Sequence, residues 1–439
     1  MLSGLSILLI LIVAFEYIRN SNRGIFLYLI LSFFAPYITF GTLTFRGELI
    51  AAPILLLITL VKKRKGILLT FPFLIWGGFV LYCIVVSFLS NIRAYNSVVN
   101  YISIFNYIRI AGLILIGANL NFSESTLINW KKYLFLASIP IFILSFGVIF
   151  QSNIANWVTK NFFTSPTRSV YETQLLSLDF GYAFRSIGVF ENVSYYATYL
   201  LIVIAIGLSF LLMGEKSPIR RNWVIYCLVL NFLAGISTSS MTFYIGIIAI
   251  AFYYFLKRPL QVIRSLSILS VFAISLVIIF WERAKESFIL YLDIFNYLTM
   301  SFLEGDKLTE RYLLSNRDTG DLSLIFKDTW FLGNGFRYYE DFVVNDSLYL
   351  EFFYQGGLIG SIIIISFVFS IFYYSFKSKT LKQHKIYIVF GLLLLAGVGC
   401  NSLAIVRFSE WIWLLIGMVS LQLGGNLPPK IDSVRIKIN

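Results

Sequence analysis

Charged residues, histidine and cysteine are all scarce in this chain of 439 residues. Asp, Glu, Lys and Arg make up 13% of it, against roughly 25% in soluble globular domains. His384 is the single histidine, and Cys83, Cys227 and Cys400 stand in apolar segments without the spacing of a zinc site or a disulfide framework. These absences argue against a soluble domain and against a metal-ligand cluster. We therefore predict that the protein uses no metal and no cofactor.

The chain consists largely of long apolar runs. Hydrophobic residues make up 58% of the chain, and runs of about 17 apolar residues or more recur along it, each long enough to cross a hydrocarbon core of roughly 30 Å. The sequence therefore predicts an all-α polytopic membrane protein, in which residues 1–439 form a single integral membrane domain with about 12–14 transmembrane helices. The predicted runs are Leu5–Ile18, Ile25–Phe40, Leu49–Val61, Ile67–Leu89, Val98–Ile116, Tyr133–Phe150, Ser194–Met213, Trp223–Ala234, Met241–Leu256, Ile263–Phe280, Leu348–Phe372, Ile386–Ile405 and Trp411–Leu423.

The net charge of +13 is explained by the loops between these runs. Lys and Arg gather in short loops beside apolar segments, as the positive-inside rule predicts for the cytoplasmic side. The expected partner of this charge is therefore the lipid bilayer and not a nucleic acid. The segments that the rule assigns to the inner side are residues 62–65, 216–221, 257–258 and 377–385 and the tail after Gly425.

On this topology two long segments, residues 151–192 and 281–346, face outward. Both are richer in polar residues than the rest of the chain, and each is too short to bury a core of its own. We expect them to form short helices and turns over the outer face of the bundle. Long ordered loops usually carry function, so they are the first place to look for a site.

Candidate side chains stand where these segments meet the membrane helices that follow. Arg185 lies ahead of the run that starts at Ser194, and a guanidinium at that depth pairs well with phosphate oxygens; snorkelling to lipid phosphates is the alternative. Asn345 and Asp346 directly precede the run that starts at Leu348. They serve either as helix caps or as catalytic and substrate-orienting groups.

Other polar residues have weaker sequence support. A charge inside an apolar run must be paired or hydrated, so Arg109 either lines a polar cavity or has a partner there. Arg407 and Glu410 are three residues apart, and we expect them to support one another. His384 stands among lysines in an inner loop and is not expected to be catalytic. The remaining candidates are Glu191, Arg311, Arg317, Tyr349 and Glu351.

Three stretches resemble the O-antigen polymerase and ligase superfamily of bacterial inner membranes. The first, FRSIGVFENVSYYATYLL from Phe184, is similar to an Arg–Gly–Phe–Asn pattern that leads into a helix. The second, LAGISTSSMTFYIGIIA from Leu233, resembles the small-residue "SGSR" turn between two helices. The third, GNGFRYYEDFVVNDSLYLEFFYQGGLIG from Gly333, resembles the "GxG…HN.yL…GllG" pattern. Where ligases carry a histidine this chain has Asn345-Asp346, which favours a polymerase.

The resemblance implies a GT-C-like membrane enzyme of the bacterial inner membrane with its active site facing the periplasm. Such an enzyme joins undecaprenyl-pyrophosphate-linked oligosaccharides into a polysaccharide by metal-independent glycosyl transfer, and a chain-length regulator protein would be a further partner. Arg185 would stabilise the departing pyrophosphate, with Arg311 or Arg317 assisting. Asp346 or Glu191 would take the acceptor proton. Asn345, Tyr349, Glu351 and Arg109 would contribute to substrate binding.

Two other functions stay open on the sequence. An O-antigen ligase would transfer the finished glycan to lipid A core instead of extending it. A lipid-linked oligosaccharide flippase would be expected to show internal repeats and polar groups near the middle of the membrane. The concentration of polar residues in two outer segments favours an enzyme.

Overall fold

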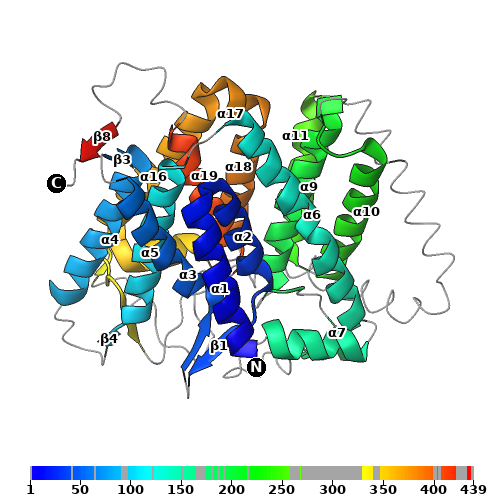
Figure 1. The fold of residues 1–439 in the computed structure, drawn as a ribbon, viewed down its shortest axis with the longest axis horizontal. Coiled ribbons are helices and arrows are strands. Elements are labelled where there is room, and N and C mark those ends of the chain that lie inside the picture. Colours follow the sequence, from blue (N-terminus) through cyan, green and yellow to red (C-terminus); the bar gives the residue numbers. More distant parts are fainter. Residues whose placement is uncertain are drawn as a thin grey trace. The chain divides into compact units, whose positions relative to one another are not determined.

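The computed structural model describes residues 2–40, 43–63, 66–89, 97–120, 123–149, 152–163, 175–178, 181–184, 188–190, 193–214, 217–238, 240–257, 267, 329–339, 347–398, 403, 407–421 and 433–436. These residues are mostly helical, as predicted (Figure 1). The predicted run Ile263–Phe280 and most of the segment 281–346 lie outside them.

Apolar helices follow one another along the described chain. They are α1 (Leu2–Arg19), α2 (Ser21–Phe34), α3 (Gly47–Lys62), α4 (Phe71–Leu89), α5 (Tyr101–Ala118), α6 (Glu124–Ile149), α9 (Val193–Met213), α10 (Arg221–Ser237), α11 (Met241–Lys257), α16 (Leu348–Lys377), α18 (Ile386–Ala396) and α19 (Ser409–Leu421). Shorter elements are α7 (Asn153–Val158), the π-helical turn η1 (Thr159–Phe163) and α17 (Lys379–Gln383).

Five of these helices, α4, α5, α6, α9 and α16, are long and apolar enough to cross a membrane by length and composition. The described helices α2, α10, α11, α18 and α19 are apolar but shorter. This agrees with the predicted all-α membrane protein. The number of spans and their orientation in a bilayer stay predictions.

Four pairs of short antiparallel strands were not predicted from the sequence. They pair β1 (Tyr37–Phe40) with β2 (Leu43–Arg46), β3 (Ile67–Thr70) with β8 (Ser433–Ile436), β4 (Ser97–Val99) with β7 (Arg337–Tyr339), and β5 (Leu175–Leu178) with β6 (Gly181–Phe184). The predicted helical run Ile67–Leu89 is thus wrong at its start. Its first four residues form β3, and the helix begins at Phe71, with Pro72 in its first turn, where a missing N–H costs nothing.

Contacts divide the chain into two compact units. Unit 1 consists of Met1–Tyr133, Asn161–Thr167 and Arg317–Asn439, and unit 2 of Leu134–Lys160 and Arg168–Asn316. In unit 2 α9 packs on α10 and α11, and its Tyr199 hydroxyl donates to Leu134 O of α6 at 3.1 Å. Asn231 of α10 donates a hydrogen bond to the Ser138 hydroxyl of α6 at 3.0 Å. Unit 1 contains the residues described in the next subsection.

The helices of unit 1 bring basic segments from distant parts of the sequence to one end. β3, next to the Lys62–Lys65 stretch, pairs with β8 of the C-terminal tail. The Asn119 side chain, at the end of α5, exchanges hydrogen bonds with the backbone of Leu68 at 3.0 and 3.1 Å. β4 and β7 pair at the other end of α4 and α5 (Figure 1).

Candidate functional site

The structure describes three of the nine predicted site residues. Tyr349, Glu351 and Arg109 are described, and all three belong to unit 1. The other six, Arg185, Glu191, Arg311, Arg317, Asn345 and Asp346, lie outside the described residues. Their roles therefore stay predictions.

Glu351 stands in the first turn of α16 and is held by two side chains. The Tyr107 hydroxyl of α5 donates a hydrogen bond to Glu351 Oε1 at 3.0 Å, and Gln355 Nε2 donates to the same oxygen at 3.1 Å. Aromatic rings surround Tyr107, which stacks on Trp76 and meets Phe336 edge to face. A carboxylate and an amide are groups that bind sugar hydroxyls, and here they meet buried aromatic rings at the start of a long apolar helix.

Gln355 has a second polar atom that the hydrogen bond to Glu351 does not use. The side chain is 6% exposed, and its Oε1 is buried without a hydrogen-bond partner among the described residues. An unsatisfied buried acceptor costs free energy of about 1–3 kcal/mol, so such atoms merit an explanation. A hydroxyl of a bound ligand would satisfy this atom.

Glu351, Gln355 and the aromatic rings around Tyr107 form what we call the Glu351 cluster. A short segment, Thr329–Arg337, closes one side of it. The backbone N–H groups of Asn334 and Gly335 donate to the carbonyls of Tyr354 and Gln355, both at 2.8 Å, and Leu358 N donates to Trp330 O at 2.8 Å. These bonds replace helical bonds that α16 loses at Gly357, where φ is 56° and ψ is −152°. A break in an apolar helix is tolerated only where other groups satisfy the freed backbone.

Glycines make this close approach feasible. Gly333 and Gly335 have φ of 78° and 62°, a region that L-residues rarely adopt. A Cβ at Gly333 would lie 2.5 Å from Gly357 N, so the two backbones touch. The glycines of the GNG and QGG motifs are therefore needed for these two backbone segments to lie in direct contact.

The N-terminus of α16 is held by the turn after α18, and the predicted caps, Asn345 and Asp346, lie outside the described residues. Ser347 occupies the N-cap position, and the carbonyl of Gly397 accepts hydrogen bonds from Leu348 N at 2.9 Å and from Ser347 Oγ at 3.3 Å. The half-exposed Tyr349 donates its hydroxyl proton to Leu394 O at 2.6 Å. The turn after α18 thus fixes the helix that carries Glu351.

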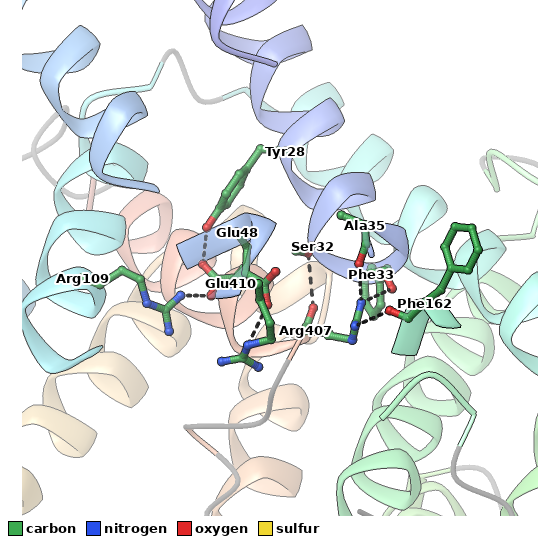
Figure 2. Close-up of polar contacts among 10 residues, drawn as sticks. Tyr28, Ser32, Phe33, Ala35, Glu48, Arg109, Phe162, Arg407 and Glu410 are labelled. Carbon is green, nitrogen blue, oxygen red and sulfur yellow. Dashed lines mark hydrogen bonds and ion pairs between the residues drawn. The ribbon is translucent and has the colours of Figure 1, made fainter. Parts of the chain in front are cut away.

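A second polar cluster of unit 1 is buried between α2, α3, α5 and α19 (Figure 2). Arg109 forms an ion pair with Glu410 Oε1, and the Tyr28 hydroxyl donates to Glu410 Oε2. Glu48, which is 1% exposed, faces the same cluster, and the nearest charge on it is the Arg46 side chain at 3.4 Å. Burial of these charges requires such pairing, because isolated ions inside a membrane domain are costly.

Arg407 is fully buried beside this cluster. It donates hydrogen bonds to Phe33 O and Ala35 O at 3.0 and 3.1 Å and to Phe162 O at 3.3 Å, and its guanidinium lies over the Phe163 ring. It satisfies the free carbonyls at the end of α2, and it ties part of the predicted outer segment 151–192 to unit 1. Its φ of 69° is unusual for a residue with a side chain.

The prediction that Arg407 and Glu410 support one another is wrong, because each side chain interacts with other groups. Glu410 pairs with Arg109 and Tyr28, and Arg407 donates to backbone carbonyls. Spacing of three residues would place both side chains on one helix face, but α19 begins at Ser409, so Arg407 precedes the helix. Arg109 has its partner in Glu410, and its role in substrate binding stays a prediction.

Comparisons with protein-family models, with curated proteins and with solved structures found no match to this chain.

Proposed function

We propose that this chain is a membrane glycosyltransferase of the O-antigen polymerase type. It would join undecaprenyl-pyrophosphate-linked oligosaccharide repeats on the periplasmic face of a bacterial inner membrane, without a metal or a cofactor. Its apolar helices and the three sequence stretches described above support this proposal. The donor is already activated by its pyrophosphate, so the protein has to align two glycans and stabilise the departing charge.

The observation that carries the proposal is the Glu351 cluster. In the stretch Gly333–Gly360, which also carries the third sequence resemblance, it has the Glu351 carboxylate and the buried Gln355 amide, whose Oε1 has no partner among the described residues. The rings of Tyr107 and Trp76 join them from α5 and α4. In the proposed reaction Glu351 and Gln355 bind hydroxyls of the acceptor sugar. Arg185 binds the leaving pyrophosphate, and Asp346 or Glu191 accepts the hydroxyl proton while the anomeric centre inverts.

The ligase is the closest alternative, and the flippase is the alternative from another class. Deletion of the gene separates the three. Loss of a polymerase leaves a single repeat unit on lipid A core, loss of a ligase leaves bare core, and loss of a flippase blocks export. A gel of surface polysaccharide from the deletion strain, in which the first pattern is expected, tests the proposed function.

Arg185→Ala should abolish polymer while the protein remains at its normal abundance in the membrane. The guanidinium is the proposed contact to the leaving pyrophosphate, and alanine offers no charge in its place. The complemented deletion strain is analysed by polysaccharide gel and by immunoblot. A full-length ladder from this variant would remove Arg185 from the site.

Glu351→Gln should reduce polymer formation by roughly 10- to 150-fold, which corresponds to the loss of a charge-assisted hydrogen bond of about 1.5–3 kcal/mol. Gln retains the shape of the side chain and an acceptor for Tyr107, so folding should be preserved. Ser366→Ala, on the exposed face of the same helix, is the matched control and should leave the ladder unchanged. Wild-type polymer length from Glu351→Gln would rule out a substrate role for this carboxylate.

A further inference from the structure

The single histidine of the chain is buried and contacts a half-exposed carboxylate, and the proposed function does not use this contact. His384 follows α17 and is 3% exposed, although lysines flank it on both sides in the sequence. Its Nε2 lies 3.1 Å from Oε1 of Glu124, the first residue of α6. Both residues belong to unit 1, so this contact joins the start of α6 to the turn between α17 and α18.

Lys131, two turns further along α6, reaches the same turn from the other side. Its side chain is buried, and its Nζ donates to the backbone carbonyl of His384 at 3.3 Å. The next residue, Lys385, has a φ of 55°, so the turn is held in a conformation that residues with side chains rarely adopt. Among the described residues, the charged groups that act on the imidazole are therefore Glu124 and Lys131 from α6, and Lys385 lies close to Lys131.

The two ring nitrogens of His384 have different surroundings. When Nε2 carries the proton that it donates to Glu124, Nδ1 is the unprotonated nitrogen. Nδ1 is buried and has no hydrogen-bond partner among the described residues. A second proton would have to sit on Nδ1, where the described residues offer no acceptor and where the Lys131 charge is close.

We propose that the His384 turn is a proton-sensitive latch, which fastens the start of α6 to the α17–α18 turn while the imidazole is neutral and releases it when the imidazole takes up a proton. Burial is the main cause that lowers the pKa of His384 below its ordinary value of about 6.5, and the Lys131 charge lowers it further. Glu124 opposes both effects. The folded protein therefore binds this proton less readily than the unfolded chain, and the stability from the latch is complete above about pH 6.5 and is lost as the pH falls below it.

The decisive measurement is a titration of His384 by NMR. Because the chain has one histidine, ring-labelled histidine gives a single imidazole in the full-length protein, provided that the purification tag contains none. The midpoint should lie below 6.5, Lys131→Met should raise it, and Glu124→Gln should lower it further. A midpoint at or above 6.5, or no response to either variant, would overturn the latch.

Release of the latch is measured separately, by the melting midpoint of the purified protein between pH 5 and pH 8. His384→Gln keeps an N–H donor for Glu124 but does not titrate, so it should lose less stability at the acidic end than the wild type. Parallel profiles for the two proteins would show that His384 does not control the contact. If His384→Gln does not fold, the pH profiles of Lys131→Met and Glu124→Gln provide the same comparison, with a smaller loss of stability at the acidic end for Lys131→Met and a larger loss for Glu124→Gln.

Discussion

Arg109→Leu and Glu410→Leu should each destabilise the protein by about 3–5 kcal/mol, whereas the double variant should recover most of that loss. Each single change leaves one charge buried without its partner, because both side chains are almost fully buried and their ion pair lies between α5 and α19. The double change replaces the pair with apolar groups, which buried sites often accept. The expected loss is a large share of a typical total stability of about 5–15 kcal/mol.

Thermal melting of the purified variants and their yield as monodisperse protein measure this effect. Arg23→Leu, at an exposed position of α2, is the matched control and should change stability by no more than about 0.5 kcal/mol. If the two single losses add in the double variant, Arg109 and Glu410 are not coupled, and the buried pair does not stabilise the helices around it.

Tyr28 contributes one hydrogen bond to the same buried cluster, through its hydroxyl group. In Glu410→Leu its buried hydroxyl loses its acceptor as well, so this single variant should be the worse of the two. The order of the two losses therefore tests whether Glu410, and not Arg109, is the centre of the cluster.

The sequence located most of the described helices, because their apolar length does not depend on their neighbours. Some ends were wrong: the run Ile25–Phe40 continues past α2 into β1, and the run Ile386–Ile405 continues past the end of α18 at Ala396. The run from Leu348 begins at the residue where α16 begins, and the run Ser194–Met213 differs from α9 by one residue. The run Tyr133–Phe150 failed at its start. α6 begins nine residues earlier, at Glu124, because its first turns carry charged side chains that an apolar-run criterion excludes, although Leu127 and Trp130 between them are buried.

The polar clusters could not be read from the sequence in the same way. Glu351 was named as a candidate, but its partner Tyr107 is 244 residues away, and Arg109 and Glu410 are 301 residues apart. Local spacing gives no information about such pairs, since they depend on which helices pack together. The one signal in the sequence is the cost of a charge in an apolar run, which indicated that Arg109 needs a partner without indicating which one.

The break in α16 is a backbone feature that local sequence could not predict either. The glycines around Gly333 and Gly357 are visible in the sequence, and the motif resemblance uses them. That two glycine-containing segments would meet backbone to backbone follows only from the fold. The helical run across Gly357 also hides the break, because its apolar pattern continues on both sides.

Gly357→Ala should cost at least about 3 kcal/mol and should release the Thr329–Arg337 segment. The φ and ψ of Gly357 belong to a region that only glycine adopts readily, and strain of this kind costs about 1–3 kcal/mol. A Cβ would also lie 2.5 Å from Gly333 N and 2.7 Å from the Phe331 carbonyl carbon, both backbone atoms that cannot rotate away. Gly391→Ala is the matched control, because its Cβ would meet nothing within 4 Å and alanine favours the helix there.

Hydrogen exchange of the Asn334, Gly335 and Leu358 amides reports on the segment directly, since these amides donate the bonds that hold it to α16. Faster exchange at these three amides, with unchanged exchange in α18, is the expected pattern for Gly357→Ala. Because the segment closes one side of the Glu351 cluster, polymer formation should fall with the loss of protection. A variant that exchanges and melts like the wild type would show that the segment does not depend on the break in α16, and the Glu351 cluster would then have to be fixed by Tyr107 and Gln355 alone.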